Sequence, residues 1–471
     1  MTAIVWFRRD LRVHDHPALR AALAADGEVV PFFCLDDRLL HGRHASVPRT
    51  RLLLECLHDL DSSMRALGGQ LVVRHGPPER ELADLVRETG ARAVHHTYDV
   101  SPYARARGRR VHAALAGLGA DLVGHPGLTV VDDVRTLGTA QGRPYSVFTP
   151  FFRAWQRAAR RDVLPAPRRV TMPAAVRVGR VPSARSLGLT GDELATPMPG
   201  GEGAGRERLE HWLRGPVGRY EDAHDLPAAD GTSRLSPYLR FGCLSPRAVE
   251  TRLPGGPGAD AFRRQLCWRD FYHHVCFHHP GNARQEHQPR YRGTLRWRQD
   301  DAAFTAWAEG LTGYPFVDAA MRQLGREGWM HNRARLIAGS FLTKDLGLDW
   351  RRGEDWFMRW LLDGDQANNN GNWQWIASVG TDPQPAFRRL YNPSSQMERF
   401  DADGRYVREY VPELRGVPGE YLCEPWTMPG EVQRRVGCRI GHDYPGPIVD
   451  HAAARREALE RYRAAAARGV G

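Results

Sequence analysis

The sequence predicts two domains of different class: an N-terminal α/β domain with a parallel sheet, and a larger all-helical domain after a long linker. Three observations lead to this fold class. The chain of 471 residues exceeds what one hydrophobic core usually organises. Short apolar runs alternate with amphipathic stretches near the N-terminus, whereas helical spacing with tryptophans dominates later. We expect the α/β domain over residues 1–129, the linker over 130–200 and the helical domain over 201–471.

Strand and helix patterns alternate through the first domain. The predicted strands cover residues 3–7, 28–35, 70–73, 91–97 and 121–124. The predicted helices cover residues 49–67, 79–89 and 103–118. This alternation is typical of a parallel sheet with helices on both faces. The first strand runs into WFRRDLR instead of GxGxxG, so the usual dinucleotide motif is absent, and a ligand would bind at the carboxyl ends of the strands.

Residues 130–200 are rich in Pro, Gly and Arg and lack sustained periodicity, which is typical of a connector. From Arg206 onward the spacing is helical and strand signals are few. The clearest predicted helices lie within residues 258–279, 315–346 and 353–363.

Composition favours a basic, intracellular protein. The formal net charge is +11, and Lys344 is the one lysine among 66 basic residues. A basic surface attracts nucleic acid or anionic membranes, although a merely solvated surface is the alternative. The sequence has no apolar run long enough for a membrane span, and its N-terminus lacks a signal-peptide pattern. Seven cysteines without a CxxC pair suggest neither a disulfide framework nor a metal site.

The segment GTSRLSPYLRFG, residues 231–242, places hydroxyl groups just before a predicted helix. Thr232, Ser233 and Ser236 could hold a phosphate together with backbone N–H groups and the helix dipole. An ordinary helix N-cap needs the same residue types, so this alternative stays open.

Two predicted helices each place an amide, a guanidinium and an apolar group on one face, since residues three and four apart are neighbours on a helix. In RQLCWRDF these residues are Gln265, Trp268 and Arg269. In HNRARL they are Asn332, Arg335 and Leu336, while Arg333 points elsewhere. The two mixed faces suggest a lined cavity, although ordinary helix packing uses the same residues.

The segment LLDGDQANNNGNWQW, residues 361–375, crowds acceptors, amides and indoles together. Asp363, Asp365 and Asn369 could bind one polar, planar ligand. Trp373 and Trp375 are two residues apart, so in a helix they face different environments. The alternative is a loop that ends in two core tryptophans, because Asn, Asp and Gly are common in turns.

Several long motifs in order resemble the DNA photolyase and cryptochrome family, most closely class I cyclobutane pyrimidine dimer photolyases. They include WFRRDLRVHDHPAL, GTSRLSPYLRFG, TGYPFVDAAMRQL, GWMHNRARL and DGDQANNNGNWQW. The resemblance implies a Rossmann-like antenna domain, a linker, and a helical domain that holds FAD in a folded conformation. It also implies light-driven electron transfer from reduced FAD to a cyclobutane dimer in UV-damaged DNA.

The resemblance assigns the FAD site by position. The phosphate side would be held by Tyr220, Thr232, Ser233, Leu235 and Ser236. The flavin and sugar parts would be surrounded by Arg269, Asn332, Arg335, Asp363, Asp365 and Asn369. Asn369 matches the residue beside flavin N5, where an amide suits a stable reduced flavin and favours repair over signalling.

The resemblance also assigns catalytic and DNA-binding roles. The electron-transfer chain would be Trp373, Trp350 and Trp297, with Asn369 and Gln265 beside the reaction. The lesion pocket would have aromatic walls at Trp268 and Trp375 and would include Gln265, Asn332 and Leu336. The phosphates around the lesion would be bound by Arg333 and by Arg388 or Arg389.

Two positions depart from the cyclobutane-dimer pattern. Gln265 stands where those enzymes have glutamate, and Leu336 where they often have methionine. Glutamine at this position also resembles (6-4) photolyases and animal cryptochromes. The (6-4) enzymes, however, carry histidines at the positions of Asn332 and Leu336, so cyclobutane dimers are the favoured lesion.

The antenna chromophore is expected to be 8-hydroxy-5-deazaflavin, because Arg49, Asp99 and Arg240 match positions used by members that bind it. Methenyltetrahydrofolate is the alternative, with His44 near a folate-contacting position, and an empty domain with ordinary surface charges is a third. A cryptochrome without repair activity and a general flavin redox enzyme are the competing functions. We expect a cytoplasmic monomer that associates with the nucleoid through DNA and does not bind membranes.

Overall fold

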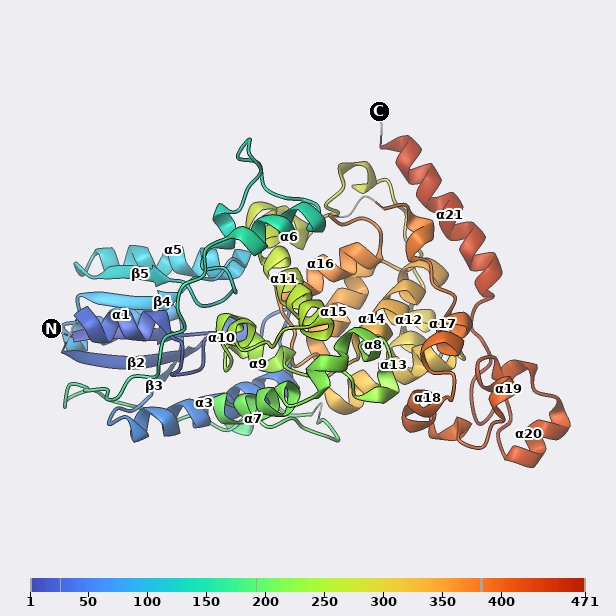
Figure 1. Cartoon of the computed structure of the whole chain (residues 1–471), viewed down its shortest axis with the longest axis horizontal. Helices are drawn as coiled ribbons and strands as arrows, with labels where there is room; N and C mark the ends of the chain where they lie inside the picture. The colour runs from blue at the N-terminus through green and yellow to red at the C-terminus, as the bar shows by residue number, and fades with distance from the viewer. Residues whose placement is uncertain (1, 26, 192, 382–383, 470–471) are drawn as a thin grey trace.

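A computed structural model describes residues 2–25, 27–191, 193–381 and 384–469. Its N-terminal part is a five-stranded parallel sheet in the order β3-β2-β1-β4-β5 (Figure 1). The strands are β1 Thr2–Phe7, β2 Glu28–Leu35, β3 Val72–His75, β4 Ala93–Thr97 and β5 Asp121–His125. β1 is buried along its whole length, as expected of a central strand covered on both faces, and its sequence is apolar from Ala3 to Phe7. The predicted fold class is confirmed.

Helices cover both faces of this sheet. They are α1 Pro17–Ala25, α2 Asp37–Leu40, α3 Val47–Ala66, α4 Pro78–Thr89 and α5 Pro102–Ala116. Ser46 and Ser101 cap α3 and α5 by accepting hydrogen bonds from backbone N–H groups three residues on. Helix α1 was not predicted, because its nine residues are mostly alanine and carry little periodicity.

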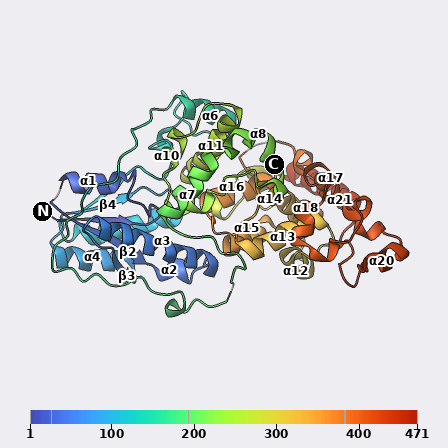
Figure 2. The same ribbon diagram turned by 60° about the horizontal axis from the view of Figure 1, so that its bottom comes forward.

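Residues 130–200 are more ordered than the predicted linker. They contain helix α6, Phe148–Arg157, which packs against α11, Pro257–His278 (Figure 2). Later in the segment the backbone pairs with the sheet: Val29 N donates to Thr171 O at 2.8 Å and Val73 N to Val178 O at 2.9 Å. The segment predicted as a linker therefore contains regular structure at residues 148–157.

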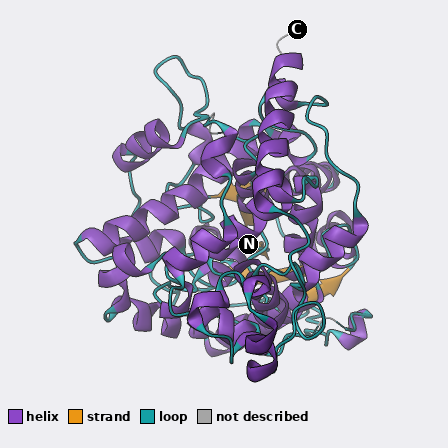
Figure 3. Cartoon of the chain, turned by 90° about the vertical axis from the view of Figure 1, so that its right-hand side faces the viewer, coloured by secondary structure: helices purple, strands orange, loops and turns teal. Residues whose placement is uncertain are grey.

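The rest of the chain is helical, and strands occupy a small part of the molecule (Figure 3). The α-helices are α7 Glu202–Leu213, α8 Tyr220–Ala223, α9 Ser236–Phe241, α10 Pro246–Thr251, α11, α12 Asp301–Glu309, α13 Pro315–Glu327, α14 Asn332–Ser340, α15 Trp350–Trp360, α16 Gln366–Ile376, α17 Pro393–Phe400, α18 Arg405–Tyr410, α19 Gly419–Leu422, α20 Gly430–Val436 and α21 His451–Arg468. The predicted helical segment 315–346 is divided, because Gly328 adopts φ 63° and ends α13.

The two parts share a hydrophobic core. One cluster of buried side chains runs from Phe7 of the sheet through Trp155 of α6 to Trp212 and Phe271 of the helical part. The carboxyl end of β1 lies against α9 and the start of α16, because Leu11 N donates to Phe241 O at 3.1 Å and Arg9 pairs with Asp365. None of the described helices is long and apolar enough to cross a bilayer. Within the described ranges, no group of three His, Cys, Asp or Glu residues is placed to hold a metal ion.

Candidate active site

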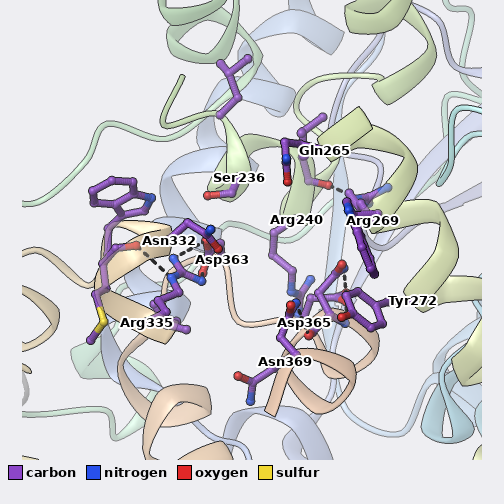
Figure 4. A pocket seen from close by; sticks show the side chains of 18 of the residues that line it. Ser236, Arg240, Gln265, Arg269, Tyr272, Asn332, Arg335, Asp363, Asp365 and Asn369 are labelled. Atoms are coloured by element: carbon purple, nitrogen blue, oxygen red, sulfur yellow. Dashed lines mark hydrogen bonds and ion pairs between the residues drawn. The ribbon is translucent and has the colours of Figure 1, made fainter. Parts of the chain in front are cut away.

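A cavity of about 470 Å³ lies where α8, α9, α11, α14 and α16 meet. This volume is in the range of cofactor sites. Figure 4 shows Ser236 and Gln265 at one side of the open space and Asn369 at the other. Of the predicted site residues, those that line it are Tyr220, Thr232, Ser233, Leu235, Ser236, Arg240, Gln265, Trp268, Arg269, Asn332, Arg335, Leu336, Asp363, Asp365, Asn369, Trp373 and Trp375.

Asp365 starts the helix that forms one wall. Its Oδ1 accepts hydrogen bonds from the backbone N and from Nδ2 of Asn368, at 2.9 and 2.8 Å, so it caps α16. The loop interpretation of residues 366–375 is therefore wrong. The asparagines lie in the first turns of helix α16, and the short side chain of Asp365 immediately before the helix supplies the N-cap acceptor.

The two tryptophans of α16 face different environments, as predicted. Trp373 is 3% exposed, and its ring lies 4.9 Å from that of Phe357. Trp375 is half-buried, with the guanidinium of Arg389 over its ring at 3.9 Å. Gly353 lets α15 approach Trp373, because a Cβ there would lie 2.1 Å from the indole Cη2.

A buried ionic network joins the sheet domain to this wall. Arg9, at the end of β1, pairs with the carboxylate of Asp365 and lies 3.5 Å from Asp99 Oδ2. Burial alone would raise the pKa of Asp365, but the guanidinium groups of Arg9, Arg240 and Arg269 hold it well below its usual value. Burial lowers the pKa of His273 to about 4, so this ring is neutral near pH 7.

Replacing Arg9 with glutamine is expected to destabilise the fold by about 1–3 kcal/mol at pH 7, less than for an isolated buried pair, because Arg240 still faces Asp365. The pKa of Asp365 is lower in the folded state, so its ion pair stabilises the fold above the unfolded pKa of about 3.9. This contribution is lost as the pH falls through the folded pKa. Thermal unfolding at several pH values should show the deficit shrinking below about pH 4.

The matched control for this variant is Arg38→Gln, which breaks the more exposed pair between Arg38 and Glu79. It should change the melting temperature little at any pH. A deficit of Arg9→Gln that stays constant down to acid pH would contradict the role assigned to Asp365.

A second ion pair stands across the cavity. Arg335 Nη2 lies 2.8 Å from Asp363 Oδ2, and Nη1 lies 3.3 Å from Oδ1 (Figure 4). Arg335 Nε also donates to the carbonyl of Met330 at 2.8 Å. The guanidinium is therefore held in one plane, and it orients the carboxylate of Asp363.

Helix α11 contributes the predicted face of Gln265, Trp268 and Arg269. The ring of Phe148 on α6 stacks on Trp268, with centroids 3.7 Å apart and planes at 3°. Arg269 donates to the backbone carbonyls of Leu128 at 2.6 Å and Leu239 at 3.3 Å. Trp268 is thus a rigid wall with one face covered, and Arg269 is anchored to the sheet domain.

Helix α14 contributes Asn332 and Leu336, whereas Arg333 points away from the cavity, as predicted. Arg333 pairs with Asp225, and its guanidinium lies 4.2 Å from the ring centroid of Phe400.

The hydroxyl groups before α9 are not used as its cap. Among the described contacts, the N-cap residue Leu235 has no side-chain cap, and Ser233 Oγ accepts from Leu235 N at 3.3 Å. Thr232 and Ser236 line the cavity instead. The ordinary N-cap alternative therefore does not describe this segment.

Some predicted site residues lie outside the cavity. They are Trp350, Trp297, Arg333, Arg388, Arg49 and Asp99. Trp350 is fully buried, and its Nε1 donates to Glu286 Oε1 at 3.4 Å, while Trp297 is half-buried. The guanidinium of Arg49, 8% exposed, donates to the carbonyl of Leu361 at 3.0 Å.

The three predicted antenna residues therefore do not line one cavity together. Arg240 belongs to the large cavity, and Asp99 pairs with Arg9 at its base. Their description as ordinary surface charges is wrong, because Arg49 and the side chain of Asp99 are buried.

Sequence reasoning missed several lining residues: Arg9, Arg234, Tyr272, Trp329, Asn368 and Asn372. Arg9 stands in the motif WFRRDLR, but nothing local links it to residues more than three hundred positions away. Asn368 and Asn372 lie one turn apart on α16, and Asn372 is also one turn from Asn369. This helical spacing could have identified Asn368 and Asn372 as lining residues.

The lining fits a large anionic cofactor. Among the described residues that form it, five are arginines (Arg9, Arg234, Arg240, Arg269 and Arg335) and two are aspartates. An excess of buried positive charge favours phosphate groups. Trp375 lines the cavity, and its Nε1 is a buried donor with no partner in the described structure, as expected of an atom that faces a ligand. The residues present therefore fit FAD.

Two family models match the chain. The one described as DNA photolyase matches residues 3–170, and the one described as the FAD binding domain of DNA photolyase matches residues 262–464. The deoxyribodipyrimidine photo-lyase of Streptomyces griseus is 45% identical over 464 residues, covering 98% of this chain and 99% of the relative.

Solved structures agree over the same length. The structure of a bacterial class III photolyase from Agrobacterium tumefaciens has a TM-score of 0.92 at 36% identity, covering 98% of this chain and 97% of that one. A cryptochrome from Synechocystis has a TM-score of 0.90 at 29% identity, covering 98% of each chain. From its motifs, fold and nearly full-length similarity, the chain belongs to the DNA photolyase family.

Proposed function

We propose that the protein binds FAD and uses light to repair cyclobutane pyrimidine dimers in DNA. The observation that carries this proposal is one open cavity with two kinds of lining. The lining includes the polar groups of Asp363, Asp365 and Asn369, which suit a flavin. It also includes the indoles of Trp268 and Trp375, which suit extruded bases.

Within this proposal, FAD would supply the light-excited electron, and the protein would bind, orient and shield it. The arginine-rich lining and the Thr232–Ser236 segment would hold its pyrophosphate. Asn369 Nδ2 already donates to the backbone carbonyl of Glu354 at 2.9 Å. Its Oδ1 could therefore accept a hydrogen bond from an N–H group of the flavin. Arg335 and Asp363 would contact the ring as an oriented pair.

The lesion would stack between two supported aromatic walls. Phe148 covers one face of Trp268, and Arg389 lies over Trp375, so neither indole must reorganise when a base arrives. Gln265 is exposed at the opening and can donate an N–H to a base carbonyl. Unlike the glutamate of related enzymes, Gln265 cannot supply a proton.

The phosphate contact is better assigned to Arg388 than to Arg389. Arg388 is exposed, whereas Arg389 is 2% exposed and donates to the carbonyl of Trp375 at 2.9 Å. Arg333 would have to release Asp225 before it could bind a phosphate. The net charge of +11 supports binding to DNA without sequence preference.

Light-dependent repair should be measured on two otherwise identical oligonucleotides, one with a cyclobutane thymine dimer and one with a (6-4) lesion. The protein is photoreduced first, and each substrate has a dark control. We expect repair of the cyclobutane dimer alone, because Asn332 and Leu336 cannot replace the histidines that the (6-4) reaction needs. Repair of the (6-4) lesion would overturn this assignment.

A cryptochrome-type light sensor is the second candidate, supported by the similarity to the Synechocystis cryptochrome over 98% of the chain. The same assay separates the two functions. Bound, photoreducible FAD without repair of either lesion would favour the sensor.

For the antenna we propose 8-hydroxy-5-deazaflavin, with methenyltetrahydrofolate as the alternative. Asp99 and Arg240 both adjoin Arg9, so a chromophore near them would lie beside the FAD cavity. Reconstitution with each chromophore, followed by energy transfer to FAD, distinguishes them.

A further inference from the structure

We propose that Glu327, the last residue of α13, is a positioning residue for the FAD site. It fixes Arg234 in the cavity wall, and Tyr410 of α18 in turn fixes Glu327. The cavity lining includes Arg234 but neither Glu327 nor Tyr410, so both act through Arg234. Helix α18 packs along α13 (Figure 1). The inference deepens the proposed function and rests on it, because the bound ligand that it concerns is FAD.

Arg234 connects this network to the cavity. It adopts φ 50°, in the left-handed region that residues with a side chain rarely occupy. Such a backbone conformation persists only when surrounding contacts hold it. The Arg234 guanidinium lies 4.3 Å from the ring centroid of Trp329, and both side chains line the cavity. The cation and the indole therefore form one stacked part of the cavity wall.

Two carboxylates contact the Arg234 guanidinium, and they differ in burial. Arg234 Nη1 donates to Glu327 Oε2 at 2.9 Å, and Nε donates to Asp230 Oδ1 at 3.2 Å. The side chain of Asp230 is 60% exposed, whereas that of Glu327 is 13% exposed. Water and salt screen an exposed ion pair more than a buried one. Glu327 is therefore the carboxylate that holds the guanidinium in place.

Tyr410 orients the carboxylate of Glu327. Its hydroxyl donates to Glu327 Oε1 and accepts a hydrogen bond from Gln323 Nε2 at 3.2 Å, which fixes the direction of donation. Tyr410 is buried, and burial together with the carboxylate raises the pKa of its phenol, so the hydroxyl stays a donor at neutral pH. One oxygen of Glu327 is thus held by Tyr410, and the other is left for Arg234.

The same network reaches a second segment of the cavity. Gln323 is buried, and its Oε1 accepts hydrogen bonds from the Tyr406 hydroxyl at 2.8 Å and from His331 N at 3.2 Å. His331 caps α14, because its Nδ1 accepts a hydrogen bond from Arg333 N at 3.2 Å. Residues of α14 line the cavity, so α13 and α18 together hold two segments of its wall.

This network preorganises a long side chain. Arginine has a large conformational entropy, and the side chain of Arg234 is 29% exposed. Holding it at the wall before FAD arrives removes the entropic cost of ordering it from the binding step. We therefore expect loss of the Glu327 contact to weaken FAD binding without changing the reaction of protein that is saturated with FAD.

The test is titration of the apoprotein with FAD in the dark, using Glu327→Gln, Tyr410→Phe and Arg234→Gln. We expect each of the first two variants to weaken FAD binding about 3- to 10-fold, the value of one hydrogen bond. In the Arg234→Gln background neither change should weaken binding further, because both act through Arg234. At saturating FAD and after photoreduction, Glu327→Gln should repair cyclobutane dimers at the wild-type rate.

The matched control is Glu413→Gln. Glu413 pairs with Arg322, which also lies on α13, at 2.8 Å, but neither residue lines the cavity. This variant should keep the FAD affinity of the wild type. Melting temperatures of the apoproteins show that each variant is folded. Tyr410→Phe, which loses a single hydroxyl group, carries the test if Glu327→Gln does not fold.

Wild-type FAD affinity in folded Glu327→Gln and Tyr410→Phe would overturn the positioning role while the proposed function stands. A loss of affinity that persists in the Arg234→Gln background would also overturn it, because the effect would then come from the fold of α13. A wild-type protein that binds no FAD would overturn the proposed function itself, and this inference with it.

Discussion

Replacing Asp363 with alanine is expected to weaken FAD binding by about 1–3 kcal/mol, which is roughly 5- to 150-fold. The variant leaves Arg335 with the carbonyl of Met330 as its hydrogen-bond acceptor and frees its guanidinium to rotate out of the cavity. We expect a free-energy loss in the lower part of the range usual for breaking a buried ion pair, because the side chain of Arg335 is 26% exposed. Titration of the apoprotein with FAD measures the change.

A double-mutant cycle isolates the contribution of the Arg335–Asp363 ion pair to FAD binding. Arg335→Ala combined with Asp363→Ala should cost less than the two single changes together, since each single change strands a partner. Asp84→Ala breaks the exposed pair with Arg87 on α4 and is the matched control. Unchanged FAD affinity in Asp363→Ala would show that this ion pair supports the fold rather than the cofactor.

Replacing Trp268 with alanine is expected to weaken binding of lesion-containing DNA by about 1–3 kcal/mol, the value of one base stacked on an aromatic ring. The indole presents a fixed face, because Phe148 stacks on it at 3.7 Å and prevents it from turning away. Trp268→Phe keeps a ring and should retain most of the affinity. Fluorescence anisotropy with lesion-containing and undamaged oligonucleotides measures the difference.

The contrast between the two DNAs is the control in this experiment. Undamaged DNA binds through phosphates, so its affinity should be unchanged, and FAD content should be unchanged as well. Equal weakening on both DNAs would place Trp268 in general DNA binding instead of the lesion pocket.

The sequence pattern predicts an element best when its residues share one environment along its whole length. β2 was predicted with its observed bounds, Glu28–Leu35, because a strand covered on both faces is apolar throughout. Helices α1 and α6 were missed: α1 is mostly alanine and carries little pattern, and α6 lies in a segment whose Pro, Gly and Arg content is typical of a connector. The segment 315–346 was predicted without its break, because Gly328 ends a helix only when the following chain turns away.

The sequence by itself determined which residues of one helix share a face. Helical spacing alone placed Gln265 with Trp268 and Arg269, and the structure puts all three on the cavity. The ion pair of Arg9 with Asp365 and the ring contact of Trp307 with Trp373 could not be predicted from spacing. Spacing acts within one element, whereas these contacts depend on tertiary packing: an ion pair joins the end of β1 to the start of α16, and a second buried cluster packs α12 and α15 against α16.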